Sequence, residues 1–212
     1  MKWPRFVSPD GTLVAQPEKV GLLMGNRGVL RPIHYERELP CAPQAPWITC
    51  VLKEDGKPLP KTTVKYTKLF MLDEVTAFAA GHRPCRSCQH HRYEEFVWMW
   101  GKSSGYGKGE VDEKLAYERG GGNDRKKIFT SALEDLPHGT FVKLPGSDQP
   151  YLTLWGKLFP WTVNGYDRPV AQEGSTMVQV LTPKPIVLMF KKGFPLSLNR
   201  EETIHSSLMR FL

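Results

Sequence analysis

The stretch GHRPCRSCQH, residues 81–90, constrains this chain most, because it holds Cys85 and Cys88 in a Cys-x-x-Cys spacing within a turn. Two thiolates in one turn can approach a metal ion from the same side, and Gly81 and Pro84 stiffen the approach. A zinc ion prefers four ligands in a tetrahedron. The pair therefore predicts half of a zinc site, with the other half elsewhere in the chain.

The candidates for the other half lie upstream. Cys50 ends the strand-like segment WITC, and Cys41 precedes it at a wider spacing than the two to about four residues of a typical zinc knuckle. His34 competes with Cys41, because imidazole nitrogen suits zinc as well as thiolate does. His34 follows the tight turn GNRG, whereas Cys41 lies in the loose stretch ELPCAPQAP. The expected ligands are Cys50, Cys85, Cys88 and either His34 or Cys41.

Other interpretations of the cysteine pair stand beside this one. A thioredoxin-like redox pair would begin a helix after a strand in a βαβ unit, whereas here a predicted helix precedes the pair. Buried, inert cysteines are a further alternative. His82, His90 and His91 are expected to be exposed histidines on a basic segment rather than ligands.

The net charge and the composition limit the classes of protein to which this chain can belong. The 212 residues carry a net charge of +7, which suits a polyanionic partner without requiring one. The N-terminus lacks a continuous apolar segment, and the longest aliphatic run, IVLMF, is too short to cross a bilayer. With four cysteines, two of them in Cys-x-x-Cys, the chain fits a reducing compartment. We expect a cytoplasmic protein with no membrane partner.

The first half reads as a hairpin, a helix, the cysteine turn and a second helix. Residues 47–72 are rich in β-branched residues with Asp55-Gly56 near the reversal, which predicts a β-hairpin. Asp73 as N-cap and Gly81 as the C′ residue mark a short helix. Apolar residues at helical spacing then predict an amphipathic helix over 89–100.

The second half changes from helical to strand-like patterns. Residues 110–119 and 124–136 are predicted helices, and strands are expected within 139–144, 151–162 and 177–182. Thr182 as N-cap and Pro183 at the first helical position predict a last helix. The predicted fold class is α+β, with a zinc-stabilised hairpin and helix region over 1–105. Central helices and a β-rich lobe over 106–212 are expected to pack as one unit with it.

The stretch KLFMLDEVTAFAAGHRPCRSCQ, residues 68–89, resembles the second half of the zinc-binding domain of Ada, the bacterial methylation-repair protein. In that family a short helix leads into a Gly-aromatic-Arg-Pro-Cys-x-x-Cys knuckle. The family's first half is a Cys-x-x-x-Cys pair in which one sulfur accepts methyl groups from DNA phosphotriesters. This chain has WITC without a partner cysteine four residues away. The resemblance therefore implies the zinc site and not the methyl-acceptor activity.

More of the chain is similar to an uncharacterised bacterial family with the patterns GNRG…H, WIxC and GHRPCxxC and a C-terminal PWT and VLTP. That resemblance implies His34, Cys50, Cys85 and Cys88 as the zinc ligands. It implies no reaction.

The first functional hypothesis is a nucleic-acid-binding protein, with DNA favoured, built around a structural zinc site. Cations on a rigid, metal-pinned turn suit phosphate contacts. The predicted phosphate-binding residues are Arg27, Arg83, Arg86 and Arg92. Aromatic residues in 155–166 could stack on bases, although a core under the β-rich lobe explains them as well.

Two other classes of function stay open. A metal-assisted nuclease or hydrolase, or a DNA-repair-type enzyme, needs carboxylates that converge on a metal. Asp73, Glu74, Asp112 and Glu118 are the candidates, but helix starts and a solvated helix face also explain them. A zinc-stapled protein-interaction module is the third class.

Overall fold

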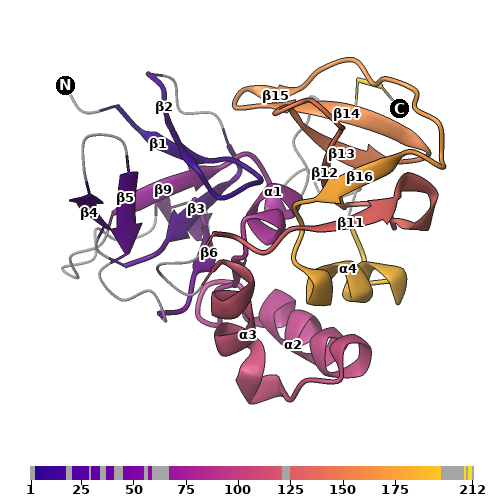
Figure 1. The fold of residues 1–212 in the computed structure, drawn as a ribbon. Coiled ribbons are helices and arrows are strands. Elements are labelled where there is room, and N and C mark those ends of the chain that lie inside the picture. Colours follow the sequence, from indigo (N-terminus) through magenta and orange to yellow (C-terminus); the bar gives the residue numbers. More distant parts are fainter. Residues whose placement is uncertain are drawn as a thin grey trace.

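The chain forms the expected α+β fold, seen here in a computed structural model. Within the described residues, two six-stranded sheets lie on either side of helix α1 (Glu74–Ala79), and the other helices lie below them in Figure 1. None of the described helices has the length and apolar character needed to span a bilayer. The structure describes residues 3–17, 21–28, 30–33, 37–40, 45–54, 57–58, 67–120, 125–196, 208 and 210–211.

The N-terminal sheet has the strand order β10-β6-β3-β9-β1-β2. Two of its pairs, β1 with β9 and β10 with β6, are parallel, and the rest are antiparallel. Its strands are β1 (Arg5–Val7), β2 (Leu13–Ala15), β3 (Leu23–Asn26), β6 (Ile48–Val51), β9 (Lys68–Met71) and β10 (Arg83–Pro84). Two separate ribbons are β4 (Leu30–Ile33) with β5 (Arg37–Pro40), and β7 (Lys53–Glu54) with β8 (Lys57–Pro58).

The predicted hairpin over 47–72 is wrong as a pairing, because β3 lies between its two arms. Met24 of β3 is opposite Cys50 of β6 on one side and Phe70 of β9 on the other. Leu23 and Met24 are buried, so the apolar run of β3 gains more by taking the centre of the sheet than an edge. The local hairpin that does form is the short β7–β8 ribbon inside the connection.

Helix α1 has the ends that the sequence predicted. Asp73 accepts a hydrogen bond from the Thr76 backbone N–H at 2.9 Å. At the other end, Gly81 adopts φ 82°, its N–H bonds to Phe78, and the N–H of His82 bonds to Ala77 at 3.0 Å. These two bonds form a Schellman motif, which turns His82 inward. His82 is fully buried, so its predicted exposure is wrong.

Two helices of the middle region were predicted. Helix α2 (His90–Ser104) buries Phe96, Val97 and Trp100 and ends at Gly105, which has φ 74°. The turn η1 (Lys108–Glu110) leads into α3 (Val111–Glu118). A buried aromatic cluster joins α1, α2 and the last helix, α4 (Lys184–Lys191).

The C-terminal sheet is antiparallel and has the order β11-β16-β12-β13-β14-β15. The predicted helix over 124–136 is wrong: it contains a strand and the turn η2 (Leu133–Asp135), because Phe129 pairs with Val180 of β16. Thr182 does not cap α4 with its side chain, since its hydroxyl instead accepts from the Phe141 N–H. The strands are β11 (Phe129–Ala132), β12 (Phe141–Lys143), β13 (Pro150–Leu154), β14 (Lys157–Thr162), β15 (Gly165–Tyr166) and β16 (Met177–Val180).

Helix α1 and the residue before it connect the two sheets. Leu72, Val75 and Ala79 belong to the same buried cluster as the side chains of the C-terminal sheet. Asp73 also accepts a hydrogen bond from the Tyr166 hydroxyl at 2.8 Å. The cysteine turn follows α1 in the chain. Because α1 packs against both sheets, both help to fix the position of the turn.

Candidate metal centre

Cys50, Cys85 and Cys88 come together at the end of the N-terminal sheet. Their sulfur atoms all lie within 4.8 Å of one another. Cys85 is buried, and the other two are partly exposed. Among the described residues, no other group of three or more cysteine, histidine or carboxylate side chains is close enough to share a metal ion.

Backbone pairing holds the cysteine turn against the strand that carries Cys50. Strand β10 runs parallel to β6, with Arg83 opposite Ile48. The N–H of Cys85 then bonds to the Thr49 carbonyl at 2.9 Å, and the Gln89 side chain donates to the same carbonyl at 2.7 Å. Thr49 directly precedes Cys50. The bonds from Cys85 and Gln89 to its carbonyl therefore hold both ends of the cysteine turn close to Cys50.

The three thiols shift one another's pKa values because their sulfur atoms lie close enough to share hydrogen bonds. A Cys85 thiolate can accept hydrogen bonds from Cys50 and Cys88 and from the backbone N–H groups of Cys88 and Ser87, which lowers the Cys85 pKa. The hydrogen bond to Cys85 raises the pKa of Cys50. The Cys50 contact lowers the pKa of Cys88, but the Cys85 contact and burial raise it overall. One sulfur is therefore already arranged to carry negative charge.

The three sulfurs suit a soft or borderline metal ion. Zinc–sulfur bonds of about 2.3 Å in a tetrahedron separate the sulfurs by about 3.8 Å, and the three sulfurs here all lie within 4.8 Å of one another. Cys88 also lies two residues before α2, whose N-terminal dipole stabilises a nearby thiolate. The two candidates for a fourth ligand, His34 and Cys41, lie outside the described residues.

The four arginines predicted to bind phosphate have very different surroundings. Arg83 is 9% exposed and holds Asp112 through two bonds of 2.7 and 2.8 Å. Arg92 holds the buried Glu74 in the same two-pronged way, at 2.8 and 2.6 Å. Each of these two arginines therefore pairs its charge with a carboxylate of the same chain.

Arg27 and Arg86 are the opposite extremes. Arg27 is only 4% exposed and donates to His82 and to the Gly11 carbonyl. Arg86, by contrast, lies exposed between the two cysteines of the turn, with Ser87 and His90 exposed beside it. Of the four, Arg86 is the one whose side chain is freely presented to solvent beside the cysteines.

The chain matches none of the known protein-family models, and no curated protein or solved structure is significantly similar to it. What the site can do follows from its own geometry.

The carboxylates proposed for a hydrolase are held in separate places. Asp73 caps α1, Glu74 pairs with Arg92, and Asp112 pairs with Arg83. Glu118 accepts from the backbone of Lys184. Each of these groups has a structural partner, so within the described chain they do not form a second metal centre.

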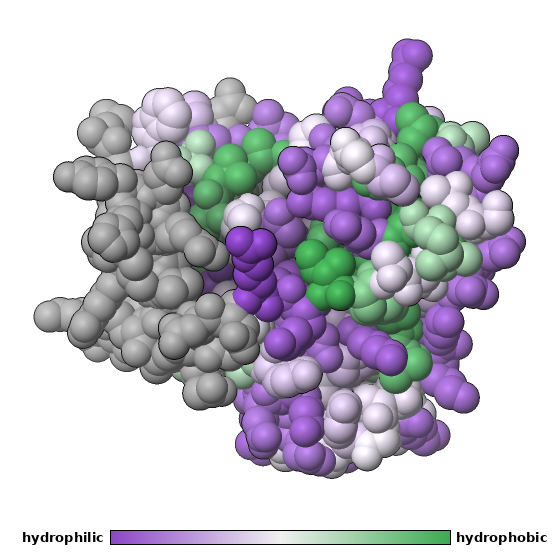
Figure 2. Space-filling view, in the orientation of Figure 1, coloured by the Kyte–Doolittle hydropathy of each residue, from purple (hydrophilic) through white to green (hydrophobic). Residues whose placement is uncertain are grey.

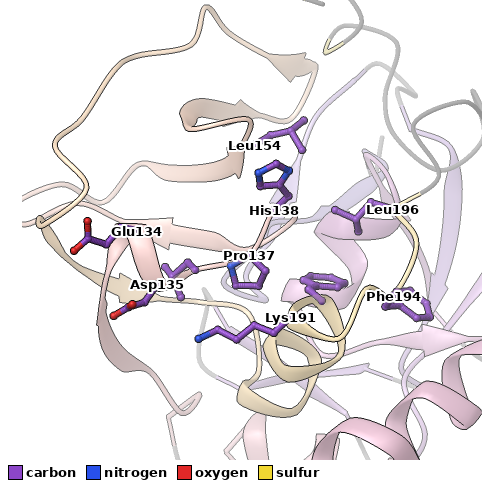
Figure 3. Close-up of a pocket in the computed structure, with 10 residues that line it drawn as sticks. Glu134, Asp135, Pro137, His138, Leu154, Lys191, Phe194 and Leu196 are labelled. Carbon is purple, nitrogen blue, oxygen red and sulfur yellow. The ribbon is translucent and has the colours of Figure 1, made fainter.

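A surface cavity of about 780 Å³ lies between η2 and the end of α4. Its ionisable side chains are spread around the rim: Figure 3 shows the carboxylates of Glu134 and Asp135 far from the imidazole of His138. The cavity therefore lacks a converging acid–base pair among the residues that line it.

The aromatic residues considered for base stacking belong mainly to the core. Phe159, Trp161 and Tyr166 are buried, and Trp155 is 38% exposed. On the face shown in Figure 2, small hydrophobic patches alternate with hydrophilic side chains. The core explanation of these aromatic residues is thus confirmed for three of the four.

Proposed function

We propose that this chain is a zinc-binding protein whose Zn²⁺ is held by Cys50, Cys85 and Cys88. The observation that carries the proposal is the convergence of three sulfurs from two distant segments within 4.8 Å. His34 completes the tetrahedron in this proposal, with Cys41 as the alternative fourth ligand. The resemblance of residues 68–89 to the Ada domain supports zinc as the ion.

The proposed role of the zinc ion is structural. Strand β10 is only two residues long, and few backbone bonds hold the turn against β6. A metal bonded to both segments would replace a large buried contact, and at small sites metal binding and folding are coupled. The zinc ion would thus fix the start of α2 and the exposed Arg86 in one orientation.

Native mass spectrometry of the full chain tests the zinc site. We expect one zinc per chain in the wild-type protein and none in Cys85→Ser or Cys50→Ser. Ser87→Ala, an exposed position in the same turn, is the matched control and should keep its zinc. Full zinc content in both cysteine variants would refute the site.

The same measurement on His34→Ala and Cys41→Ser identifies the fourth ligand. Loss of zinc in His34→Ala alone supports the proposed set. Loss in Cys41→Ser alone replaces His34 by Cys41.

Nucleic-acid binding is the second candidate function, and the exposed group beside the cysteines favours it. Arg86, Ser87 and His90 present a cation and hydrogen-bond donors next to the start of α2, where no side chain caps the helix. The net charge of +7 adds attraction for a polyanion. In this proposal DNA contacts Arg86, while Arg83 and Arg92 hold the supporting structure.

A salt-dependent DNA-binding assay tests this second candidate. We expect measurable affinity at low salt that falls as salt increases, and a weaker affinity and smaller salt slope in Arg86→Ala. Lys192→Ala removes the same charge from an exposed position after α4 and serves as the control. Absence of binding at low salt would favour the zinc-stapled protein-interaction module instead.

A further inference from the structure

A second cluster contains cationic side chains that lie against the indole ring of Trp47. The guanidinium carbon of Arg27 lies 3.8 Å from the centre of this ring, and that of Arg119 lies 4.3 Å from it. The His82 ring is also in contact with Trp47, with 5.1 Å between centroids. We call these four residues the Trp47 cluster, and we include Lys126 because its charge acts on Arg27 and His82.

Hydrogen bonds fix the orientation of the buried members. Arg27 Nε donates to His82 Nε2 at 3.1 Å, and Arg27 Nη1 donates to the Gly11 carbonyl at 2.9 Å. Because His82 Nε2 is an acceptor, a neutral His82 carries its proton on Nδ1. Burial and the nearby Arg27 and Arg119 charges lower the pKa of His82 well below its ordinary value, which keeps it neutral.

Three N–H groups of the cluster have no acceptor. Within the described structure, Arg27 Nη2, His82 Nδ1 and Trp47 Nε1 are buried and make no hydrogen bond. Arg27 and His82 are themselves 4% and 0% exposed. Buried donors are normally satisfied, so each of these three N–H groups lacks an acceptor that a bound ligand could supply.

The cluster also holds more positive than negative charge. Arg119 and Lys126 use their N–H groups on the neutral carbonyls of Gly81, Ala45, Pro9 and Ala79. The neighbouring carboxylates have other partners: Asp10 has Lys143, Asp112 has Arg83, and Glu118 has the Lys184 backbone N–H.

Burial disfavours the charged form of two cations in the cluster. Burial is the main cause that lowers the pKa of Lys126 to about 7; attraction from Asp10 and Glu118 opposes it, and repulsion from Arg27 and Lys143 adds to it. Burial lowers the pKa of Arg119 to about 10. A bound anion would offset both effects, because an opposite charge nearby favours the protonated amine and guanidinium.

We propose that the Trp47 cluster binds a phosphate group, either as free phosphate or at the end of a phosphomonoester. Guanidinium, indole and imidazole N–H groups all donate to phosphate oxygens, and a dianion matches the excess of cations. Trp47, Arg119 and Lys126 are only partly buried, so part of the cluster reaches the surface. A duplex backbone cannot reach Arg27 at its depth, which favours a small ligand or a terminal phosphate.

Thermal unfolding of the zinc-loaded full chain tests the proposal. The probes are inorganic phosphate and phenyl phosphate, and sodium chloride at matched ionic strength is the reference. We expect one or both phosphates to raise the melting temperature above the chloride reference, as binding to the folded state requires. A rise with phenyl phosphate alone would identify a phosphomonoester as the source. Equal melting temperatures in phosphate and chloride would overturn the proposal.

Two variants locate the binding site. His82→Gln places an amide oxygen where Nε2 accepts from Arg27 but removes the Nδ1–H donor, and Arg119→Gln removes one cation. Titration calorimetry should show at least tenfold weaker phosphate binding in each folded variant, and unchanged binding in Lys192→Ala, which removes an exposed cation after α4. Unchanged binding in Arg119→Gln would also overturn the proposal. Zinc content measured on the same samples should stay constant, which separates this result from the metal site.

Discussion

At the scale of single residues, the Asp73 carboxylate joins two parts of the molecule through one buried contact. It caps α1 and accepts from the Tyr166 hydroxyl of β15. Tyr166→Phe keeps the ring and removes that donor from a fully buried acceptor. We expect a loss of about 1 to 3 kcal/mol in the free energy of unfolding. Urea denaturation measures it, with the 62%-exposed Tyr117→Phe as a near-neutral control.

The buried amine of Lys126 should make the free energy of unfolding depend on pH. Its pKa falls from 10.5 to about 7 in the folded protein because burial disfavours the charged amine. Between these values the unfolded chain binds more protons at this group than the folded chain, so stability should rise with pH from about 7 to 10. Lys126→Met should flatten this slope in zinc-loaded protein without phosphate. An unchanged slope in the variant would show that other groups cause the pH dependence.

The sequence identified the cysteines but not the use of the arginines. Cys85 and Cys88 form a local motif, and Cys50 was the cysteine with a strand-like context, so their convergence was predictable. Arg83 and Arg92 looked like surface cations because their partners, Asp112 and Glu74, are 29 and 18 residues away. For His82 a local signal existed, since the C″ position of a Schellman motif usually packs inward.

At the scale of elements, the sequence predicted both ends of α1 but not the pairing of the strands. Asp73 and Gly81 act within a few residues of themselves, so the sequence predicted α1 correctly. The order β6-β3-β9 depends on which apolar run takes the centre of the sheet, a competition between distant segments. The strand β11 was missed for the same reason: its partner β16 follows more than 40 residues later.

The entry into β3 depends on Gly21. It has φ 138°, and a Cβ atom there would lie 2.5 Å from the Met71 carbonyl oxygen of β9. Gly21→Ala should destabilise the protein by about 2 kcal/mol or more, through backbone strain and overlap. Gly109→Ala, with open space and no positive φ, is the control in the same denaturation experiment. Equal stability of the two variants would contradict this account of the β3–β9 contact.

Zinc removal should loosen a defined set of elements. Strand β10 and the start of α2 are joined to β6 through the cysteine turn, whereas β12, β13 and β14 pair with one another and with β15 and β16. After chelation, we expect faster hydrogen exchange in residues 48–51 and 83–93 and little change in 141–162. Uniform acceleration across both sheets would instead make the zinc ion a global requirement for folding.

At the scale of the whole molecule, the two sheets share a core rather than a boundary. Leu72, Val75 and Ala79 from the first half are buried with Phe141 and Leu152 from the second half. Arg92 of α2 also donates to the Pro195 carbonyl after α4. A division at residue 105, as the sequence pattern suggested, would remove α1 from the apolar surface that it covers.

Fragments of the chain test whether that shared core is needed for folding. Residues 106–212 alone should lack fixed tertiary structure, because the surface that Leu72, Val75 and Ala79 cover would face water. Residues 67–212 restore β9 and α1 and should give better dispersed amide resonances. Mixing 1–105 with 106–212 should restore native dispersion if the two halves recognise each other through α1. A well-dispersed spectrum from 106–212 by itself would mean that its sheet folds independently and that α1 docks onto a finished core.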